Sequence, residues 1–303
     1  MKRNDSFSSY HPVINLLYFI FTIGYALAFN HPVCLGIAFI GAVSYMICIR
    51  GARVFVKSLK VMVPVIIITA LLNPAFSHEG ATIITYLPTG NPLTLESVWY
   101  GISAAFMFVT VVCWFWNFNY VITSDKLVYL FGKAAPVLSL MLSMTLRLVP
   151  DITAQFKKVY KASLAAGYSV NGKHFVKLRL ACHVFSAVVS WELERAITTA
   201  DSMKSRGYGL PGRTAYSIFR FKKSDMLAGM VISALGIYIL FGALHGGFRF
   251  YYYPWVTGEL TGLLTCSMYV CYAFLVLFPV AINMWDAIRI KRTLGDFGKE
   301  QRD

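Results

Sequence analysis

The chain has 303 residues, of which 57% are hydrophobic and only 14% are charged. A soluble domain usually carries about 25% charged residues. This sequence also contains several apolar runs of nearly 20 residues, so it indicates a multi-pass membrane protein rather than a large soluble one. The net charge is +14, but the cations lie in clusters between apolar runs, which argues against the basic face of a nucleic-acid-binding domain.

The clusters of Lys and Arg orient the expected spans. Residues 123–225 hold 16 of the 28 basic residues, and none lies in 61–125. Short loops rich in Lys and Arg stay in the cytoplasm, so this cluster and the basic segments near 50–60 and 289–292 predict both termini inside. Six apolar segments fit this alternation: 13–29, 33–49, 59–72, 97–118, 226–245 and 260–283. Pro64 lies in the third of them and should kink or break that helix.

Two loops are expected on the opposite side of the membrane. The segment 73–96 contains no basic residue, and its β-branched run 82–85 leads into a turn that is rich in Pro, Gly and Asn. This pattern predicts a short extracytoplasmic hairpin. The second loop carries an aromatic run, 248–255, which is typical of the membrane–water interface.

The sequence therefore divides into three regions. Residues 1–122 hold four spans, 123–224 form a cytoplasmic module, and 225–303 hold two spans and a basic tail. The predicted fold class is an all-α integral membrane protein with about six transmembrane helices, long cytoplasmic helices and a short extracytoplasmic hairpin.

Two long helices are predicted within the cytoplasmic module. The first begins at Pro136, because proline suits the first turn of a helix, and ends near Gly167. The second runs over 175–204 and ends before Gly207. An apolar stripe along each helix is typical of packing against a neighbour.

Both helices end at a short sequence that contains glycine, Ala165-Ala166-Gly167 and Ser205-Arg206-Gly207. An ordinary left-handed glycine cap explains these ends by itself. The alternative is a docking role, because Arg206 offers a fork of donors at a helix end and Gly207 lets another surface approach, as an acidic groove on a partner would require. Possible supporting residues are Arg147 and Asp151, expected as an i,i+4 ion pair, and Arg213.

Several kinds of site are excluded by their missing motifs. The sequence contains no G-x-x-x-x-G-K-[ST] phosphate loop, and the G-x-G-x-x-G formed by Gly207, Gly209 and Gly212 follows a helix rather than a strand. The six His and six Cys show no metal-ligand spacing. The middle of each span lacks carboxylates, whereas ion-coupled carriers place ionisable groups there. We therefore expect neither catalysis nor a cofactor, with a stand-alone channel or carrier as the rival function and a membrane-embedded enzyme as the weakest one.

An ordered set of segments over about residues 70–225 carries a resemblance to a known family. The segments are Leu72-Asn73-Pro74, Ser77-His78-Glu79-Gly80, Tyr86-Leu87-Pro88 through Asn91-Pro92, Thr145-Leu146-Arg147-Leu148-Val149-Pro150, Ser205-Arg206-Gly207-Tyr208 and Gly212-Arg213-Thr214. Together they resemble the transmembrane coupling subunit of energy-coupling factor (ECF) transporters, the EcfT/CbiQ family.

The resemblance implies a multi-pass protein of a bacterial or archaeal plasma membrane. Its cytoplasmic helix ends would sit in grooves on two ABC-type ATPases, which bind the ATP, and its helices would cradle a small membrane subunit that binds a vitamin or metal ion. The family's Ala-Arg-Gly-like motifs correspond here to Ala165-Ala166-Gly167 and Ser205-Arg206-Gly207. Because Ala166 replaces the first arginine, Arg206 is expected to make most of the polar contact.

Overall fold

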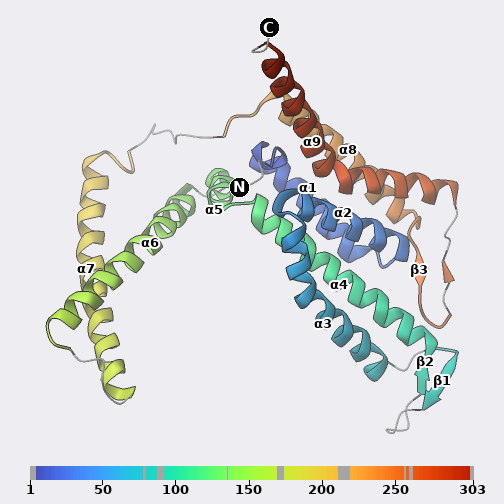
Figure 1. The fold of residues 1–303 in the computed structure, drawn as a ribbon, viewed down its shortest axis with the longest axis horizontal. Coiled ribbons are helices and arrows are strands. Elements are labelled where there is room, and N and C mark those ends of the chain that lie inside the picture. The colour runs from blue at the N-terminus through green and yellow to red at the C-terminus, as the bar shows by residue number, and fades with distance from the viewer. Residues whose placement is uncertain are drawn as a thin grey trace. The chain divides into compact units, whose positions relative to one another are not determined.

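The computed structural model describes residues 5–77, 80–86, 92–134, 136–168, 174–210, 219–255, 257–258 and 262–300. The chain divides into two compact units (Figure 1). The membrane unit comprises Met1–Thr123 and Phe219–Asp303, and the three-helix unit comprises Ser124–Ile218.

The membrane unit is built almost entirely from helices. Five of the described helices are long and apolar enough to cross a membrane, and the 17-residue helix α1 is apolar but shorter. These lengths and compositions confirm the predicted class, an all-α membrane protein. The helices are α1 (Pro12–Ala28), α2 (Pro32–Arg50), α3 (Ala52–Phe76), α4 (Leu95–Val121), α8 (Lys223–Leu244) and α9 (Leu263–Glu300), preceded by the short 3-10 helix η1 (Phe7–Ser9).

Local sequence explains where the first two helices begin. His11 and His31 each precede a proline at the first helical position, where the missing N–H carries no penalty. The Nδ1 atom of His11 accepts the N–H of Val13 at 3.4 Å, and that of His31 accepts the N–H of Val33 at 3.3 Å. The His-Pro pairs thus cap both helices in the same way.

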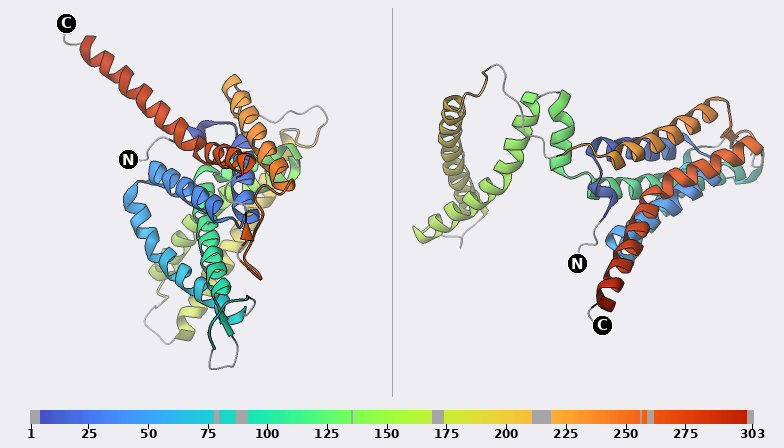
Figure 2. Two further views of the ribbon diagram at one scale, coloured as in Figure 1. Left: turned by 90° about the vertical axis from the view of Figure 1, so that its right-hand side faces the viewer. Right: turned by 90° about the horizontal axis from the view of Figure 1, so that it is seen from above.

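The core of the membrane unit is aromatic and contains polar atoms. Helix α4 packs against α1, α2 and α3, while α2 also packs against α9 (Figures 1 and 2). Tyr18, Tyr45, Trp114 and Tyr272 are fully buried. The hydroxyl of Tyr18 donates to the carbonyl of Val276 at 3.0 Å, which satisfies one polar group within the apolar bundle.

Helix α3 differs from its prediction. The expected span 59–72 is part of a continuous helix, Ala52–Phe76, which contains both Pro64 and Pro74. Pro64 therefore does not break the helix. An apolar surrounding leaves backbone groups few partners outside a helix, so a proline within a span is tolerated.

The basic segment near residue 50 was expected to be a loop, but it is helical except at Gly51. A single residue, Gly51, with φ +85°, separates α2 from α3. Arg50 belongs to the last turn of α2, and Lys57 and Lys60 belong to α3. The Arg50 guanidinium donates to the carbonyl of Trp116 at 3.0 Å, so this cation also ties α2 to α4.

The hairpin predicted within 73–96 is present in a shorter form. Strands β1 (Ile83–Tyr86) and β2 (Pro92–Thr94) are antiparallel, with Ile83 opposite Thr94. Residues 73–76 and 95–96 of the predicted segment belong to α3 and α4. Glu96 accepts the hydroxyl of Thr82 at 2.7 Å, which ties α4 to the start of the hairpin.

Only part of the aromatic run 248–255 is exposed at the surface. It contributes β3 (Phe250–Tyr251), which pairs with β4 (Thr257–Gly258). Phe248 and Tyr252 are buried, whereas Trp255 is exposed. The hydroxyl of Tyr252 donates to the carbonyl of Asn30 at 3.2 Å, so part of this run packs onto the helices.

The three-helix unit contains α5 (Ser124–Ala134), α6 (Pro136–Ala165) and α7 (His174–Ser205). The small apolar contact between α6 and α7 is formed by Leu180, Val184 and Val188 against Ile152 and Val159. Spacings of four residues place the three α7 side chains on one face of that helix. Most of the remaining surface of both helices is exposed.

Candidate functional site: two helix ends in the three-helix unit

The last turns of α6 and α7 have the same backbone geometry. At the end of α6, the N–H of Tyr168 donates to the carbonyl of Ser163 at 3.2 Å, and that of Gly167 donates to Leu164 at 3.1 Å. Gly167 has φ +93°. This pair of bonds around a left-handed glycine is a Schellman motif.

The end of α7 repeats this motif residue by residue. The N–H of Tyr208 donates to the carbonyl of Met203 at 3.0 Å, and that of Gly207 donates to Lys204 at 3.0 Å. Gly207 has φ +76°. The shared motif places Ala166 and Arg206 at the same position, immediately before the glycine. The glycine caps predicted from the sequence are therefore present at both helix ends.

Arg206 is the chemical difference between the two ends. Its side chain is exposed, and it forms no ion pair within the part of the chain that the structure describes. A cation near a helix C-terminus is stabilised by the helix dipole, so Arg206 needs no internal carboxylate. Its five N–H donors can therefore form hydrogen bonds with water or with a partner protein.

The predicted pairing of Arg147 with Asp151 is wrong. The Arg195 Nη2 of α7 lies 2.8 Å from the Asp151 Oδ2 of α6 and donates a hydrogen bond to it. Arg147 is exposed. Sequence spacing suggests only the pair within one helix, whereas the crossing of α6 and α7 brings Arg195 closer. Arg213 lies outside the described residues.

Two further residues complete the surroundings of Arg195. Its guanidinium carbon lies 5.2 Å from the ring centre of Trp191, and its Nη1 lies 3.8 Å from Glu192 Oε1. The hydrogen bond to Asp151 is the main cause of the raised pKa of Arg195. Local sequence motifs contain no signal for this cluster, because one of its carboxylates comes from another helix.

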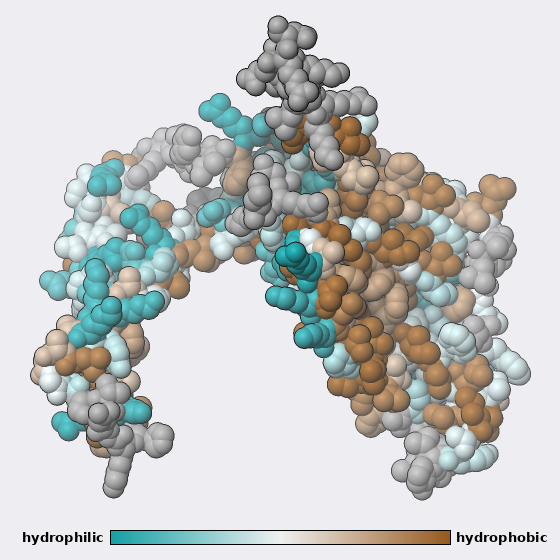
Figure 3. Space-filling model, viewed as in Figure 1, coloured by the Kyte–Doolittle hydropathy of each residue, from teal (hydrophilic) through white to brown (hydrophobic). Residues whose placement is uncertain are grey.

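Both long helices also expose large apolar side chains. Figure 3 shows patches of hydrophobic surface on the three-helix unit among strongly hydrophilic ones. Exposed apolar side chains at this density are typical of surfaces that another molecule covers. They include Leu138, Met141 and Val149 on α6, and Phe175, Leu178, Phe185, Leu193 and Ile197 on α7.

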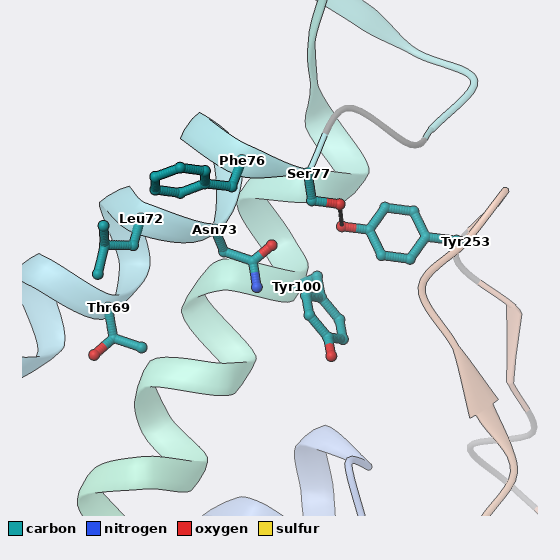
Figure 4. Close-up of a pocket in the computed structure, with 7 residues that line it drawn as sticks. All are labelled: Thr69, Leu72, Asn73, Phe76, Ser77, Tyr100 and Tyr253. Carbon is teal, nitrogen blue, oxygen red and sulfur yellow. Dashed lines mark hydrogen bonds between the residues drawn. The ribbon is translucent and has the colours of Figure 1, made fainter.

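The membrane unit contains an open pocket of about 640 Å³ at the end of α3 (Figure 4). Leu72, Asn73 and Ser77, which contribute to the sequence resemblance, line it together with Tyr100 of α4 and Tyr253. The hydroxyls of Ser77 and Tyr253 are 3.2 Å apart and hydrogen-bonded. The lining therefore combines polar side chains with aromatic and aliphatic ones.

The residues that the structure describes do not bring together three His, Cys, Asp or Glu side chains that could hold a metal ion. Cys34 and Cys113 are buried, and all six cysteines are free thiols. The features that distinguish this unit are its two capped helix ends and the exposed guanidinium of Arg206.

Comparison with known proteins decides the family. Residues 5–216 match the family model of CbiQ, described as "Cobalt transport protein", and this range covers more than half of the chain. The chain belongs to the CbiQ family. The matched residues include α1–α7 and both helix ends.

Curated relatives of this CbiQ-family chain carry the name of an energy-coupling factor transporter transmembrane protein. The chain is 28% identical over 204 residues to EcfT 1 of Listeria monocytogenes, which is 62% of this chain and 75% of the relative. It is 30% identical over 114 residues to EcfT of Streptococcus thermophilus, which is 37% of this chain and 43% of the relative. The chain is also 29% identical over 111 residues to EcfT of Streptococcus equi subsp. equi, covering 36% of this chain and 41% of that relative.

The cap of α7 in this CbiQ-family chain can be tested by replacing Gly207 with Ala. A left-handed conformation costs a non-glycine residue about 1–2 kcal/mol, so the last turn should open more often, and amide exchange at position 207 and at Tyr208 should be about 5–30 times faster. Hydrogen exchange with mass spectrometry measures this change. Gly209→Ala is the control, because Gly209 also has a positive φ, +93°, but lies beyond the cap bonds. Equal exchange at Tyr208 in the two variants would contradict the assigned cap.

Proposed function

We propose that this chain is the transmembrane energy-coupling subunit of an ECF-type importer. It transmits the motion of two ABC-type ATPases, a homodimer or heterodimer, to a separate small membrane subunit that binds the imported vitamin or metal ion. The chain itself is non-catalytic, and ATP is bound by the ATPases. Membership of the CbiQ family and the names of the curated relatives support this assignment.

The observation that carries the proposal is the pair of matching helix ends. Each completes a helix of 30 residues or more, and each presents an exposed residue directly before a left-handed glycine. Two equivalent ends suit two equivalent partners, as an ATPase pair would provide. Arg206 supplies the charged donor group at one end, whereas Ala166 limits the other end to backbone and apolar contacts.

The exposed apolar side chains of α6 and α7 support a second contact. An apolar surface between hydrophilic patches fits a hydrophobic membrane subunit better than water. The protein is assigned to a bacterial or archaeal plasma membrane, and the distribution of Lys and Arg favours cytoplasmic termini.

Co-purification from the native membrane tests this proposal. The tagged chain is extracted in a mild detergent, and the bound proteins are identified by mass spectrometry. We expect two copies of ABC-type ATPase and one small, very hydrophobic subunit, and the ligand of that subunit identifies the cargo. Recovery of the chain alone, with solute flux in vesicles that contain only this chain, would instead establish a stand-alone channel or carrier.

A further inference from the structure

Two carboxylates lie near the Arg195 guanidinium, but only one of them accepts a hydrogen bond from it. Its Nη2 is 2.8 Å from Asp151 Oδ2 of α6, within hydrogen-bond distance. Its Nη1 is 3.8 Å from Glu192 Oε1 of the same helix, which is an ion pair but too long for a hydrogen bond. The interhelical contact is therefore made, while the intrahelical contact is close but incomplete.

Glu192 is positioned for the second contact. It continues the four-residue spacing of Leu180, Val184 and Val188, so it lies on the α7 face that packs against α6. Its Oε1 atom is buried and accepts no hydrogen bond from the residues that the structure describes. A buried carboxylate oxygen without a hydrogen bond is costly, so Glu192 can accept the Arg195 guanidinium once Asp151 no longer holds it.

The cost of exchange between the two carboxylates is low. The side chains of Arg195 and Asp151 are 37% and 40% exposed, and ion pairs this exposed stabilise a fold only weakly. The Trp191 ring, 5.2 Å from the Arg195 guanidinium carbon, keeps the cation near both carboxylates by a cation–π contact. A short movement of the guanidinium is enough to change its partner.

We propose that Arg195 is an exchangeable clasp between α6 and α7. It bonds Asp151 when the helices are crossed as in this structure, and it transfers to Glu192 when they separate. Because both helix ends lie on these two helices, the clasp positions one end relative to the other. Its use in transport rests on the proposed function, whereas the exchange itself is a property of the isolated chain.

The clasp can be tested by measuring the separation of the helices. Spin labels are attached through unnatural amino acids at Ser143 of α6 and Ser202 of α7, both exposed, in the full-length chain. We expect Asp151→Asn to broaden the distance distribution and to lengthen its mean. Glu194→Gln, which removes a neighbouring exposed carboxylate, is the matched control and should leave the distribution unchanged. A distribution for Asp151→Asn as narrow as that control overturns the proposal.

A double-mutant cycle tests the second partner. Glu192→Gln alone should have little effect on the thermal unfolding temperature, because Arg195 already bonds Asp151. In the Asp151→Asn background the same change should lower that temperature further, because it removes the remaining carboxylate partner. Additive effects would overturn the exchange. Both measurements use the chain without ATPases, so they remain interpretable if the proposed transport function fails.

Discussion

Replacing Arg206 with Ala should strongly reduce both the retention of the ATPases and ATP-driven uptake. Truncating one partner of a buried, hydrogen-bonded charge pair at an interface costs about 2–5 kcal/mol, which weakens binding by at least about 30-fold. The fold should remain intact, because Arg206 is exposed and forms no ion pair within the described residues. Quantitative co-purification and uptake in reconstituted vesicles measure the two effects.

A matched control separates this specific role from a general loss of charge. Lys204 is an exposed cation in the last turn of the same helix, so Lys204→Ala should leave ATPase retention nearly unchanged. The reverse experiment, Ala166→Arg, adds a donor fork at the equivalent position of the first end and should maintain or increase retention. Normal uptake by Arg206→Ala would refute the docking role and leave the glycine cap as the sole explanation of the α7 end.

The largest expected loss of stability comes from Gly41→Ala. Helices α2 and α9 approach so closely that a methyl group at Gly41 would overlap Cγ1 of Val276. Inserting volume into a packed core typically costs about 1–3 kcal/mol. The thermal unfolding temperature of the protein in detergent should therefore fall, and the yield of folded protein should fall with it.

Two variants make this prediction specific. Gly36 lies on the same helix, and no atom lies within 4 Å of the position that a methyl group would occupy there. Gly36→Ala should therefore be neutral or slightly stabilising, because alanine favours helices. Combining Gly41→Ala with Val276→Ala removes the overlapping methyl groups and should recover part of the stability. Equal unfolding temperatures for Gly41→Ala and Gly36→Ala would contradict the close approach.

Features that depend on a few adjacent residues were predictable from the sequence. The apolar runs predicted membrane helices because the length of a span and the cost of burying charge act along the chain itself. Gly167 and Gly207 predicted helix ends because only a residue without a side chain adopts a positive φ at little cost. The sequence resemblance likewise indicated the family that the comparison then established.

Other features were decided by the tertiary structure, because they depend on residues that are distant in sequence. Spacing within α6 favours Arg147 as the partner of Asp151, but the crossing with α7 brings Arg195 to 2.8 Å. Pro64 would interrupt a helix in water, yet α3 continues through it, because an apolar surrounding favours continued hydrogen bonding within the helix. Gly36 and Gly41 both lie in the apolar run that forms α2. Only Gly41 is sensitive to substitution, because α9 packs closely against it. Local chemistry along the chain thus determined the membrane helices and their ends, whereas packing between helices decided which side chains meet.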